Sequence, residues 1–404
     1  ILIFFIKYNY FVQYILKMKF SKNDVIRAGK RLIDDNLLND QEALHHTMSI
    51  LTYWRDSHLL PLEKSNRLLN KYIHHIDKDA FIAKRIKRFE SIKRKLKRFE
   101  SMELKNMQDI GGIRIVLSSQ KQVNSMLKIL TNEPSFNKNG SLIKLDNYIK
   151  NPKFDGYRSI HLIGVFQNED LDERKIEFQL RTKLQHSWAT TLEIIDIFTQ
   201  QNLKSDNGFQ TYKDFFKNVS DLFQIIENFK SFTKNNMGLI QKDLLDYLEK
   251  NEDAYKKGYE IVRFLGRRID QGSTIKDQLK VYCSSLKELN TELSTTDKKS
   301  FILIRLNTKT GKVENEKFSK KESKDALELY SFYEQTLSKN PDIIVALLST
   351  DAIGGLQEAY PNYFADSETF LNYIDIIEMS VKMRLIQEKL ADLLKTKKQP
   401  EKTN

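Results

Sequence analysis

The chain has 404 residues, of which 40% are hydrophobic and 30% charged, so it is long enough for two or three domains and has the composition of a soluble globular protein. Its one cysteine, Cys283, excludes a disulfide framework and a cysteine-based zinc site, and fits a reducing cytoplasm. The net charge of +12 and the isoelectric point of about 9.3 favour polyanionic partners such as nucleotides, RNA or a membrane surface.

Residues 1–17 are apolar and aromatic, but Lys7, Asn9, Gln13 and Lys17 interrupt them. The segment is too short and too interrupted for a spanning helix, and no small-residue cleavage site follows it. We expect a spurious or disordered extension, with a membrane anchor as the less favoured interpretation. The protein is expected in the cytoplasm without stable membrane association.

Apolar spacing predicts helices at residues 20–36, 39–60 and 62–77, with Pro61 as the stop of the second helix. Trp54 and His58 lie four residues apart and therefore share one helical face. They could line a nucleotide pocket, but packing of this helix on the core is the favoured interpretation.

Residues 84–105 hold ten cations and three acids. Ile92, Leu96 and Phe99 follow an i, i+4, i+7 spacing, which predicts an amphipathic helix over the whole segment. A turn and a buried strand come next, with a single acid, Asp109. A charge run is usually a solvated face, but cations beside a lone carboxylate are also typical of a polyphosphate–magnesium site.

Two further segments predict strands with one polar face, joined by a turn at residues 167–170. The second strand alternates apolar Ile176, Phe178 and Leu180 with polar Glu177, Gln179 and Arg181, and in the first strand Tyr157, Ser159 and His161 share a face. A solvated sheet face is the ordinary alternative, but this density of catalytic residue types favours a site. A helix at 120–131 and a strand at 141–149 precede the pair, and a helical stripe that includes Trp188 follows it, with Trp188 expected in the core.

The C-terminal half changes character. Charged amphipathic helices are predicted over 209–295, followed by a hairpin from residue 300, a helix at 320–338, a strand at 342–350 and further helices. The predicted organisation is a domain at 18–203, a helical region at 204–295, a small α+β module at 296–395 and a disordered tail at 396–404.

Four motifs in order resemble those of the RelA/SpoT synthetase family, which transfers pyrophosphate from ATP to the 3′-hydroxyl of GDP or GTP to make alarmones such as ppGpp, the signal of the stringent response. They are Arg85-x-Lys87 with Lys95, Asp109-Ile-Gly-Gly-Ile-Arg114, Pro152 to His161, and Glu177-x-Gln179-x-Arg181-Thr182. The resemblance covers roughly residues 45–200. It implies an α+β fold, with a mixed β-sheet flanked by helices as in nucleotidyltransferase-like synthetases.

The resemblance also implies roles, which fit the need of pyrophosphoryl transfer for charge neutralisation and positioning. Arg85, Lys87, Lys95 and Arg114 would bind ATP; Asp109 and Glu177 would hold Mg²⁺, with Glu177 accepting the hydroxyl proton; and Lys153, Tyr157, Ser159, His161, Gln179 and Arg181 would bind the acceptor. Tyr157 would stack on the acceptor base.

Two departures bear on the acceptor. Asp155 stands where alarmone-making members usually have asparagine, and Asp146 stands where they usually have a cation. An anion near the acceptor phosphates disfavours GDP or GTP, while the basic composition favours a larger polyanion. The chain thereby resembles toxic small alarmone synthetases, some of which modify the CCA end of tRNA and stop translation, while others make adenosine alarmones. Guanine nucleotide, adenine nucleotide and tRNA all stay open as acceptors.

The segments on either side of the motifs leave further questions open. The roughly eighty residues before Arg85 lack a His-Asp dipeptide, so no hydrolase domain is expected. Residues 205–404 could be a built-in antitoxin or self-inhibitory region, a sensor or an oligomerisation module. The alternative function is a catalytically inactive RNA- or nucleotide-binding regulatory module, against which the presence of both Asp109 and Glu177 speaks.

Overall fold

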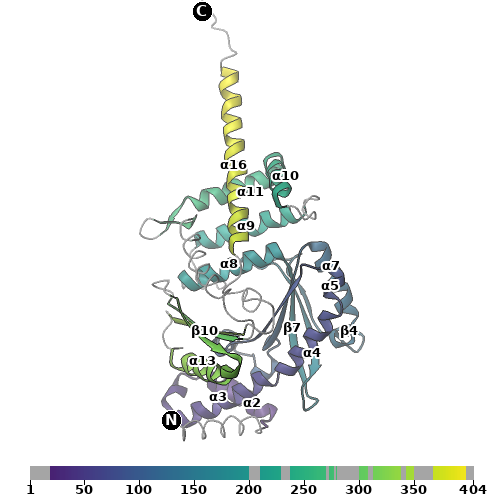
Figure 1. The fold of residues 1–404 in the computed structure, drawn as a ribbon, viewed down its shortest axis with the longest axis vertical. Coiled ribbons are helices and arrows are strands. Elements are labelled where there is room, and N and C mark those ends of the chain that lie inside the picture. The colour runs from purple at the N-terminus through teal and green to yellow at the C-terminus, as the bar shows by residue number, and fades with distance from the viewer. Residues whose placement is uncertain are drawn as a thin grey trace, which may run out of the picture. The chain divides into compact units, whose positions relative to one another are not determined.

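The computed structural model describes residues 19–199, 210–228, 237–269, 273–276, 279, 300–307, 313–337, 343–349 and 367–396 (Figure 1). The chain divides into two compact units. The first holds residues up to 115 with 122–146 and 160–180, and the second holds 116–121, 147–159 and the residues from 181 onward. The predictions for residues 1–17, for the segment just before residue 300 and for the tail from 397 lie outside the described residues.

The first unit begins with helices whose ends are set by local hydrogen bonds. These are α2 (Lys22–Leu32), α3 (Gln41–Asp56), α4 (Leu59–Asn70) and α5 (Ile73–Ile76), with a 3-10 turn, η1 (Asp35–Asn39), between the first two. Ser21 caps α2 in a capping box with Asp24, and Asp40 caps α3. The prediction that Pro61 ends a helix is wrong, because Pro61 lies in the first turn of α4, where its missing N–H costs nothing.

A five-stranded sheet lies beside these helices, with strand order β1-β2-β7-β6-β5. The strands are β1 (Phe81–Ile86), β2 (Gly111–Leu117), β5 (Leu145–Asn147), β6 (Ile160–Gln167) and β7 (Glu173–Thr182). β6 and β7 form the predicted antiparallel hairpin, with Ile163 opposite Glu177. Helix α4 contacts β1 and β6. The predicted fold class, a mixed sheet flanked by helices, is confirmed.

Three local predictions need correction. Residues 84–105 do not form one helix, because residues 84–86 complete strand β1, which pairs with β2, and helix α6 covers only Phe89–Arg98. Phe99 caps the end of α6 and is 45% exposed, so it is not part of the apolar stripe. Tyr157 and Ser159 precede β6 and therefore do not share its polar face.

Other elements follow the sequence more closely. The helix predicted at 120–131 is α7 (Gln120–Asn132), which is confirmed. The strand predicted at 141–149 is two short strands, β4 (Ser141–Leu142) and β5, and β4 pairs with β3 (Asn137–Lys138). Two further 3-10 turns, η2 (Leu104–Asn106) and η3 (Pro134–Phe136), complete the connections.

The core of the first unit joins α2, α3, α6 and the turn before β2. Trp54, Ile92, Leu96, Met107 and Ile110 are all buried in it. Trp54 and His58 meet edge to face at 5.1 Å, and both are buried, so their predicted packing role is confirmed.

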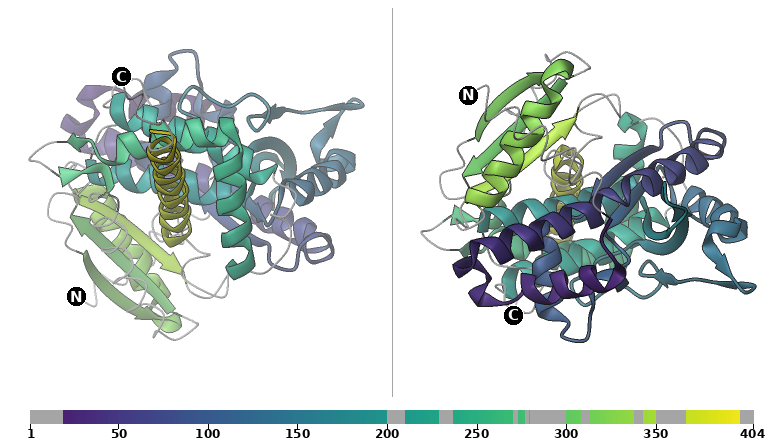
Figure 2. Two further views of the ribbon diagram at one scale, coloured as in Figure 1. Left: turned by 90° about the horizontal axis from the view of Figure 1, so that it is seen from above. Right: turned by 90° about the horizontal axis from the view of Figure 1, so that it is seen from below.

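The second unit is built on helices with phenylalanine-rich contacts. They are α8 (Lys183–Thr199), α9 (Gln210–Glu227), α10 (Met237–Lys250), α11 (Glu252–Leu265) and α16 (Ser367–Thr396), the last seen end-on in Figure 2. Phe216 of α9 and Phe370 of α16 stack at 5.8 Å, and Trp188 is buried in the same core, as predicted.

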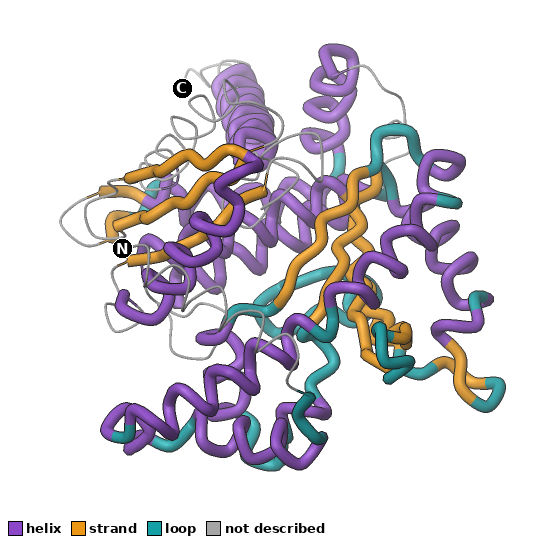
Figure 3. The backbone as a smooth tube through the Cα atoms, turned by 60° about the horizontal axis from the view of Figure 1, so that its bottom comes forward, coloured by secondary structure: helices purple, strands orange, loops and turns teal. Residues whose placement is uncertain are grey.

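The hairpin, helix and strand predicted from residue 300 are present in the described residues, whereas α16, predicted as part of the same module, contacts α8, α10 and α11 instead. Strands β10 (Ser300–Asn307), β11 (Val313–Ser319) and β12 (Ile343–Ser349) form an antiparallel sheet with β10 in the centre. Helix α13 (Ser323–Leu337) packs on this sheet, after a 3-10 turn, η5 (Lys320–Glu322) (Figure 3). A small ribbon, β8 (Arg268–Ile269) with β9 (Ser273–Thr274), follows α11. Across all of these described elements, none of the helices combines the length and the apolar character that a bilayer crossing requires.

Candidate active site

Asp109 is held between two lysines in the first unit. Its Oδ2 atom accepts a hydrogen bond from Lys87 Nζ at 2.9 Å, and its Oδ1 atom accepts one from Lys95 Nζ at 2.8 Å. Lys87 and Asp109 are largely buried, with 12% and 13% of their side chains exposed, while Lys95 is 28% exposed. The carboxylate and the two ammonium groups therefore leave one surplus positive charge beside Asp109.

Backbone pairing explains why these residues meet. The amide of Lys87, just past β1, donates to the carbonyl of Ile110 at 2.8 Å, and this bond fixes Lys87 beside the turn that carries Asp109. Lys95 is placed by α6, whose Ile92 and Leu96 are buried in the core. The two cations thus come from different elements and converge on one carboxylate.

Burial and charge oppose each other in this triad. Burial alone would raise the pKa of Asp109, but the positive charges of Lys87 and Lys95 hold that pKa below its usual value. Burial lowers the pKa of Lys87, and the neighbouring Arg85 and Lys95 act in the same direction against the attraction of Asp109. Asp109 is therefore ionised at neutral pH.

Glu177 is the second acid of the site, on the polar face of β7 that the sequence predicts. An imidazole nitrogen of His161, Nδ1, lies 3.1 Å from Glu177 Oε1, and Gln179 Nε2 donates to Glu177 Oε2 at 2.6 Å. Arg114 on β2 donates in turn to Gln179 Oε1 at 3.4 Å. These four side chains form one hydrogen-bonded row across β2, β7 and β6.

The charges around Glu177 decide its protonation. Burial would raise the pKa of Glu177, but hydrogen bonding and positive charge from His161, with help from Gln179 and Arg85, hold it well below its usual value. The negative charge of Glu177 acts in the opposite direction on Asp109 and raises its pKa, so the two acids are close enough to interact electrostatically. A β-carbon at Gly112 would lie 3.8 Å both from the Arg85 side chain and from the Glu177 carbonyl oxygen, which places Arg85 at this point of the sheet.

The loop before β6, residues 147–159, belongs to the second unit and carries the remaining predicted residues. Lys153 Nζ lies over the rings of Tyr148 and Tyr157, at 4.6 Å and 5.0 Å from their centroids. The two rings meet at 6.2 Å. This aromatic pair with a cation above it presents the kind of surface on which a nucleobase stacks. We call residues 147–159 the acceptor loop, after the role that the resemblance predicts for them.

Asp155 has a structural role in the acceptor loop. Its Oδ1 atom accepts a hydrogen bond from the amide of Tyr157 at 2.9 Å, and the residue is 8% exposed. An asparagine oxygen would accept the same bond, since this turn needs only a short side-chain acceptor. Asp146 is paired with Lys144 at 3.2 Å in the first unit, so its charge is partly compensated.

Two other predicted acceptor residues are deeply buried. Ser159 is fully buried, and its carbonyl accepts from the amide of Tyr148 at 2.9 Å. Arg181 is 2% exposed, and its guanidinium contacts the imidazole of His186 on α8. The structure therefore gathers Lys87, Lys95 and Asp109 into one cluster, and His161, Glu177, Gln179 and Arg114 into another, but buries these two side chains elsewhere.

Sequence reasoning missed Tyr148 and Arg158. The Lys153 ammonium lies over the rings of both Tyr148 and Tyr157. The sequence signal that could have found Tyr148 is the presence of a second aromatic residue within ten positions of Tyr157. Arg158 makes three polar contacts, two with α9 and one with the start of the loop, and nothing local in the sequence indicates them.

The donor set bears on a metal. Among the described side chains, no group of three or more His, Cys, Asp and Glu could hold an ion. Asp109 and Glu177 are two hard oxygen donors, and Mg²⁺ commonly takes one or two carboxylates and completes its shell with water and phosphate oxygens. The two residues fit that use, provided that Lys87 or Lys95 releases an Asp109 oxygen.

Residues 84–195 match the family model described as "Region found in RelA / SpoT proteins". This part of the chain contains both clusters and the acceptor loop, and we refer to it as the RelA/SpoT region after the model that it matches.

Individual relatives and a solved structure are similar to parts of the chain. GTP pyrophosphokinase YwaC of Bacillus subtilis is 33% identical over 114 residues, 26% of this chain and 52% of the relative. GTP pyrophosphokinase YjbM of the same organism is 29% identical over 132 residues, 31% of this chain and 61% of the relative. The chain thus spans about half to three-fifths of the length of these relatives. The crystal structure of small alarmone synthetase 1 from B. subtilis bound to its product pppGpp aligns over 48% of this chain and 97% of that one, with 21% identity and a TM-score of 0.38.

Proposed function

We propose that the protein is a pyrophosphokinase that transfers the β- and γ-phosphates of ATP to a ribose 3′-hydroxyl. The observation that carries this proposal is the pair of ionised acids, Asp109 between Lys87 and Lys95, and Glu177 beside His161, inside a RelA/SpoT region. Two curated relatives are named GTP pyrophosphokinases, which supports the same reaction class.

In the proposed step the acceptor's 3′-hydroxyl oxygen attacks the β-phosphorus of ATP. A new oxygen–phosphorus bond forms, the bond from the β-phosphorus to the oxygen that bridges it to the α-phosphorus breaks, and AMP leaves with that oxygen. The hydroxyl proton passes to Glu177, which is ionised and therefore able to receive it. Lys87, Lys95 and Arg85 neutralise the phosphate oxygens, which is most of what this reaction asks of a protein.

Mg²⁺ is the proposed cofactor, held by Asp109 and Glu177. When bound, it would act as a Lewis acid on the phosphate oxygens and neutralise charge that develops there. On binding of ATP and metal, the phosphates take over the lysines that now bond to Asp109, which frees the carboxylate. Without these ligands, the ion pairs with Lys87 and Lys95 neutralise the negative charge of Asp109.

A guanine nucleotide is the first candidate acceptor. The named activity of the relatives favours it. The sequence argument against a guanine nucleotide rests on the negative charges of Asp155 and Asp146. Their contacts weaken this argument, because Asp155 accepts a hydrogen bond from the backbone of its own turn and Asp146 is paired with Lys144.

The 3′ CCA end of tRNA is the second candidate, and it would make the protein a translation-blocking toxin. The observation that favours it is the net charge of +12 together with Arg94, Lys97 and Arg98, which are exposed on α6 next to the site lysine Lys95. Such cations supply sequence-independent affinity for a phosphate backbone.

The decisive experiment supplies γ-labelled ATP and Mg²⁺ with GDP, GTP, an adenine nucleotide or deacylated tRNA, and resolves the labelled products. We expect label on one class of acceptor and release of AMP. Glu177→Gln should abolish transfer, while the matched control Glu173→Gln, at the exposed start of the same strand, should keep it. Absence of label on every acceptor, with ATP unconsumed, would favour the alternative, an inactive nucleotide- or RNA-binding module.

A further inference from the structure

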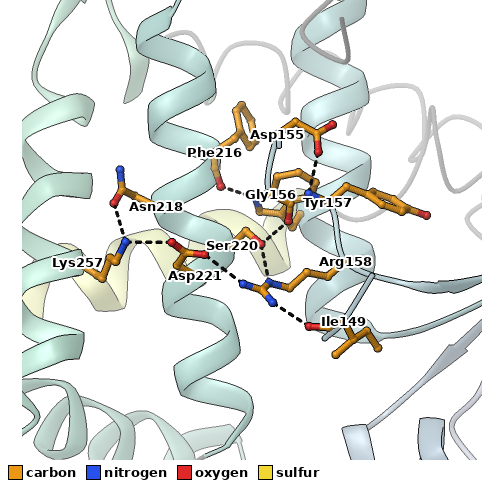
Figure 4. Close-up of polar contacts among 11 residues, drawn as sticks. Ile149, Asp155, Gly156, Tyr157, Arg158, Phe216, Asn218, Ser220, Asp221 and Lys257 are labelled. Atoms are coloured by element: carbon orange, nitrogen blue, oxygen red, sulfur yellow. Dashed lines mark hydrogen bonds and ion pairs between the residues drawn. The ribbon is translucent and has the colours of Figure 1, made fainter. Parts of the chain in front are cut away.

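One helix outside the RelA/SpoT region holds the acceptor loop. Helix α9 starts at Gln210, well past residue 195, and both α9 and the loop belong to the second unit. Ser220 Oγ on α9 donates to the carbonyl oxygen of Gly156 at 2.5 Å and accepts from Arg158 Nε at 3.0 Å (Figure 4). A single hydroxyl therefore bonds to two residues that flank Tyr157.

A charged contact reinforces this hydroxyl. Arg158 Nη2 donates to Asp221 Oδ1 at 3.1 Å, and Lys257 Nζ of α11 donates to Asp221 Oδ2 at 2.9 Å. Arg158 Nη1 also donates to the carbonyl of Ile149 at 3.0 Å, so one guanidinium joins both ends of the acceptor loop to α9. Only 11% of the Arg158 side chain is exposed, which makes these charge-assisted bonds stronger than surface ion pairs.

The backbone of the loop lies directly against α9. Gly156 has φ of +91°, which L side chains rarely adopt, and a β-carbon there would lie 3.1 Å from Ser220 Cβ and 3.2 Å from Lys217 Cα. Glycine therefore permits both the turn and the approach to the helix. The indole of Trp188 donates to the carbonyl of Phe216 at 2.8 Å, which fixes α9 at the same level (the Phe216 carbonyl is drawn in Figure 4).

A second contact from α9 reaches the end of β7. Thr182 donates its hydroxyl to Glu227, and Gln185 Nε2 donates to Glu227 Oε2 at 2.8 Å. Thr182 is the last residue of the motif that begins at Glu177, and Gln185 lies three positions further along the chain. Helix α9 thus binds two different segments of the RelA/SpoT region through side chains at its middle and its end.

We propose that Ser220 and Asp221 are positioning residues for the acceptor, so that the C-terminal helices set the geometry of the acceptor loop. The proposal rests on the proposed function, in which Tyr157 and Lys153 receive the acceptor. Under this proposal, part of the C-terminal region contributes to acceptor binding, because contacts with α9 hold the acceptor loop in its conformation. A change in α9 or α11, such as the binding of a partner, would therefore act on acceptor binding.

The first test uses Asp221→Asn in the full chain, with Asp214→Asn as matched control. Asp214 lies on the same helix, and its carboxylate bonds to Gln210 of the same turn. Loss of one charge-assisted anchor should raise the KM for the acceptor about tenfold, with the KM for ATP and kcat within about twofold. Asp214→Asn should match the wild type. An equal change in both KM values, no change in either, or the same change in the control would overturn the proposal.

The second test does not need activity. Hydrogen exchange of the amides of residues 152–159 should be about tenfold faster in Asp221→Asn and in Ser220→Ala than in wild type, with α2 unchanged. Ser220→Ala serves if Asp221→Asn fails to fold, since it removes one hydroxyl and leaves the ion pair. Arg158→Lys, which keeps a cation for Asp221, should restore part of the protection that Arg158→Met loses.

The two proposals fail in different ways. If wild type transfers label to no acceptor but the variants still open the loop, the proposed function fails and the anchoring stands. If transfer is normal and loop exchange is the same in wild type, Asp221→Asn and Ser220→Ala, the anchoring fails and the proposed function stands.

Discussion

His161 Nδ1 lies 3.1 Å from Glu177 Oε1, and this contact spans the hairpin diagonally, because Glu177 stands opposite Ile163 and His161 opposite Gln179. The imidazole thus reaches the neighbouring position on the same face of the sheet. Glu177 owes its ionisation in a buried place largely to this partner.

The first prediction concerns the pH dependence of transfer. Because the pKa of Glu177 is lowered, its carboxylate stays ionised until the pH falls well below the usual glutamate range. Protonation of Glu177 should therefore cause no loss of kcat/KM within the usual glutamate range. His161→Gln removes the positive partner while burial remains, so the pKa of Glu177 rises. The acidic limb of the variant should therefore move to higher pH, measured as a normalised profile of kcat/KM. An unmoved limb would show that His161 does not control Glu177.

The second prediction separates two lysines in the last turn of α6, Lys95 and Lys97. Lys95→Met removes one of the two cations on Asp109, which keeps Lys87, so we expect the KM for ATP to rise by about tenfold or more with a small change in stability. Lys97→Met is the matched control, since Lys97 lies two positions after Lys95 and pairs only at the surface, with the exposed Asp35. Such surface pairs contribute about 0–1 kcal/mol to stability. Steady-state kinetics with both variants decide the matter, and equal effects would remove Lys95 from ATP binding.

The site's polar row on β7 could be predicted because strand alternation is a local property. Ile176, Phe178 and Leu180 are fully buried, and Glu177 and Gln179 take the other face, as the sequence indicates. The same rule misplaced Tyr157 and Ser159, since the positive φ of Gly156 interrupts the extended backbone before β6 begins. Alternation of polar and apolar side chains predicts the two faces of a strand, but it does not reveal the residue at which the strand starts.

The basic segment shows the opposite failure. Helical spacing of Ile92 and Leu96 is real, but the pairing of Lys87 with Ile110 draws residues 81–86 into the sheet, and this long-range bond has no signature in local periodicity. The contacts of Arg158 with Ser220 and Asp221 are equally invisible, because they join residues more than sixty positions apart. The motifs therefore identify the candidate site residues, while tertiary pairing decides which contacts surround them.

The third prediction concerns Glu227, a buried acid outside the active site. Burial raises the pKa of Glu227 to about 7 from an ordinary value of 4.5. In this window the folded state binds more protons than the unfolded state, so the contribution of Glu227 is fully present below about pH 4.5 and is lost as the pH rises through about 7. Stability from this group thus falls with rising pH.

Glu227→Gln copies the protonated acid, with the amide oxygen accepting from Gln185 and the amide nitrogen donating to Thr182. The variant should therefore be more stable than wild type at about pH 8, by about 1–3 kcal/mol, and the difference should vanish near pH 4.5. Urea unfolding at both pH values measures it. His58, whose pKa burial lowers to about 4, changes stability in the opposite direction, but it is common to both proteins and cancels in the comparison.

The fourth prediction tests whether α16 and α9 share one core. Phe370 at the start of α16 is fully buried, and its ring centroid lies 5.8 Å from those of Phe216 and Phe223 on α9. Phe370→Ala should lower the free energy of unfolding of the second unit by about 3–5 kcal/mol, because it removes a large apolar side chain and leaves a cavity. Phe332→Ala on α13, where the side chain is 56% exposed, should change it by less than about 0.5 kcal/mol. Since α9 also holds Gly156 and Arg158, Phe370→Ala should speed hydrogen exchange in the acceptor loop as well. A destabilised α16 with an unchanged loop would mean that α9 keeps its position without the phenylalanine cluster.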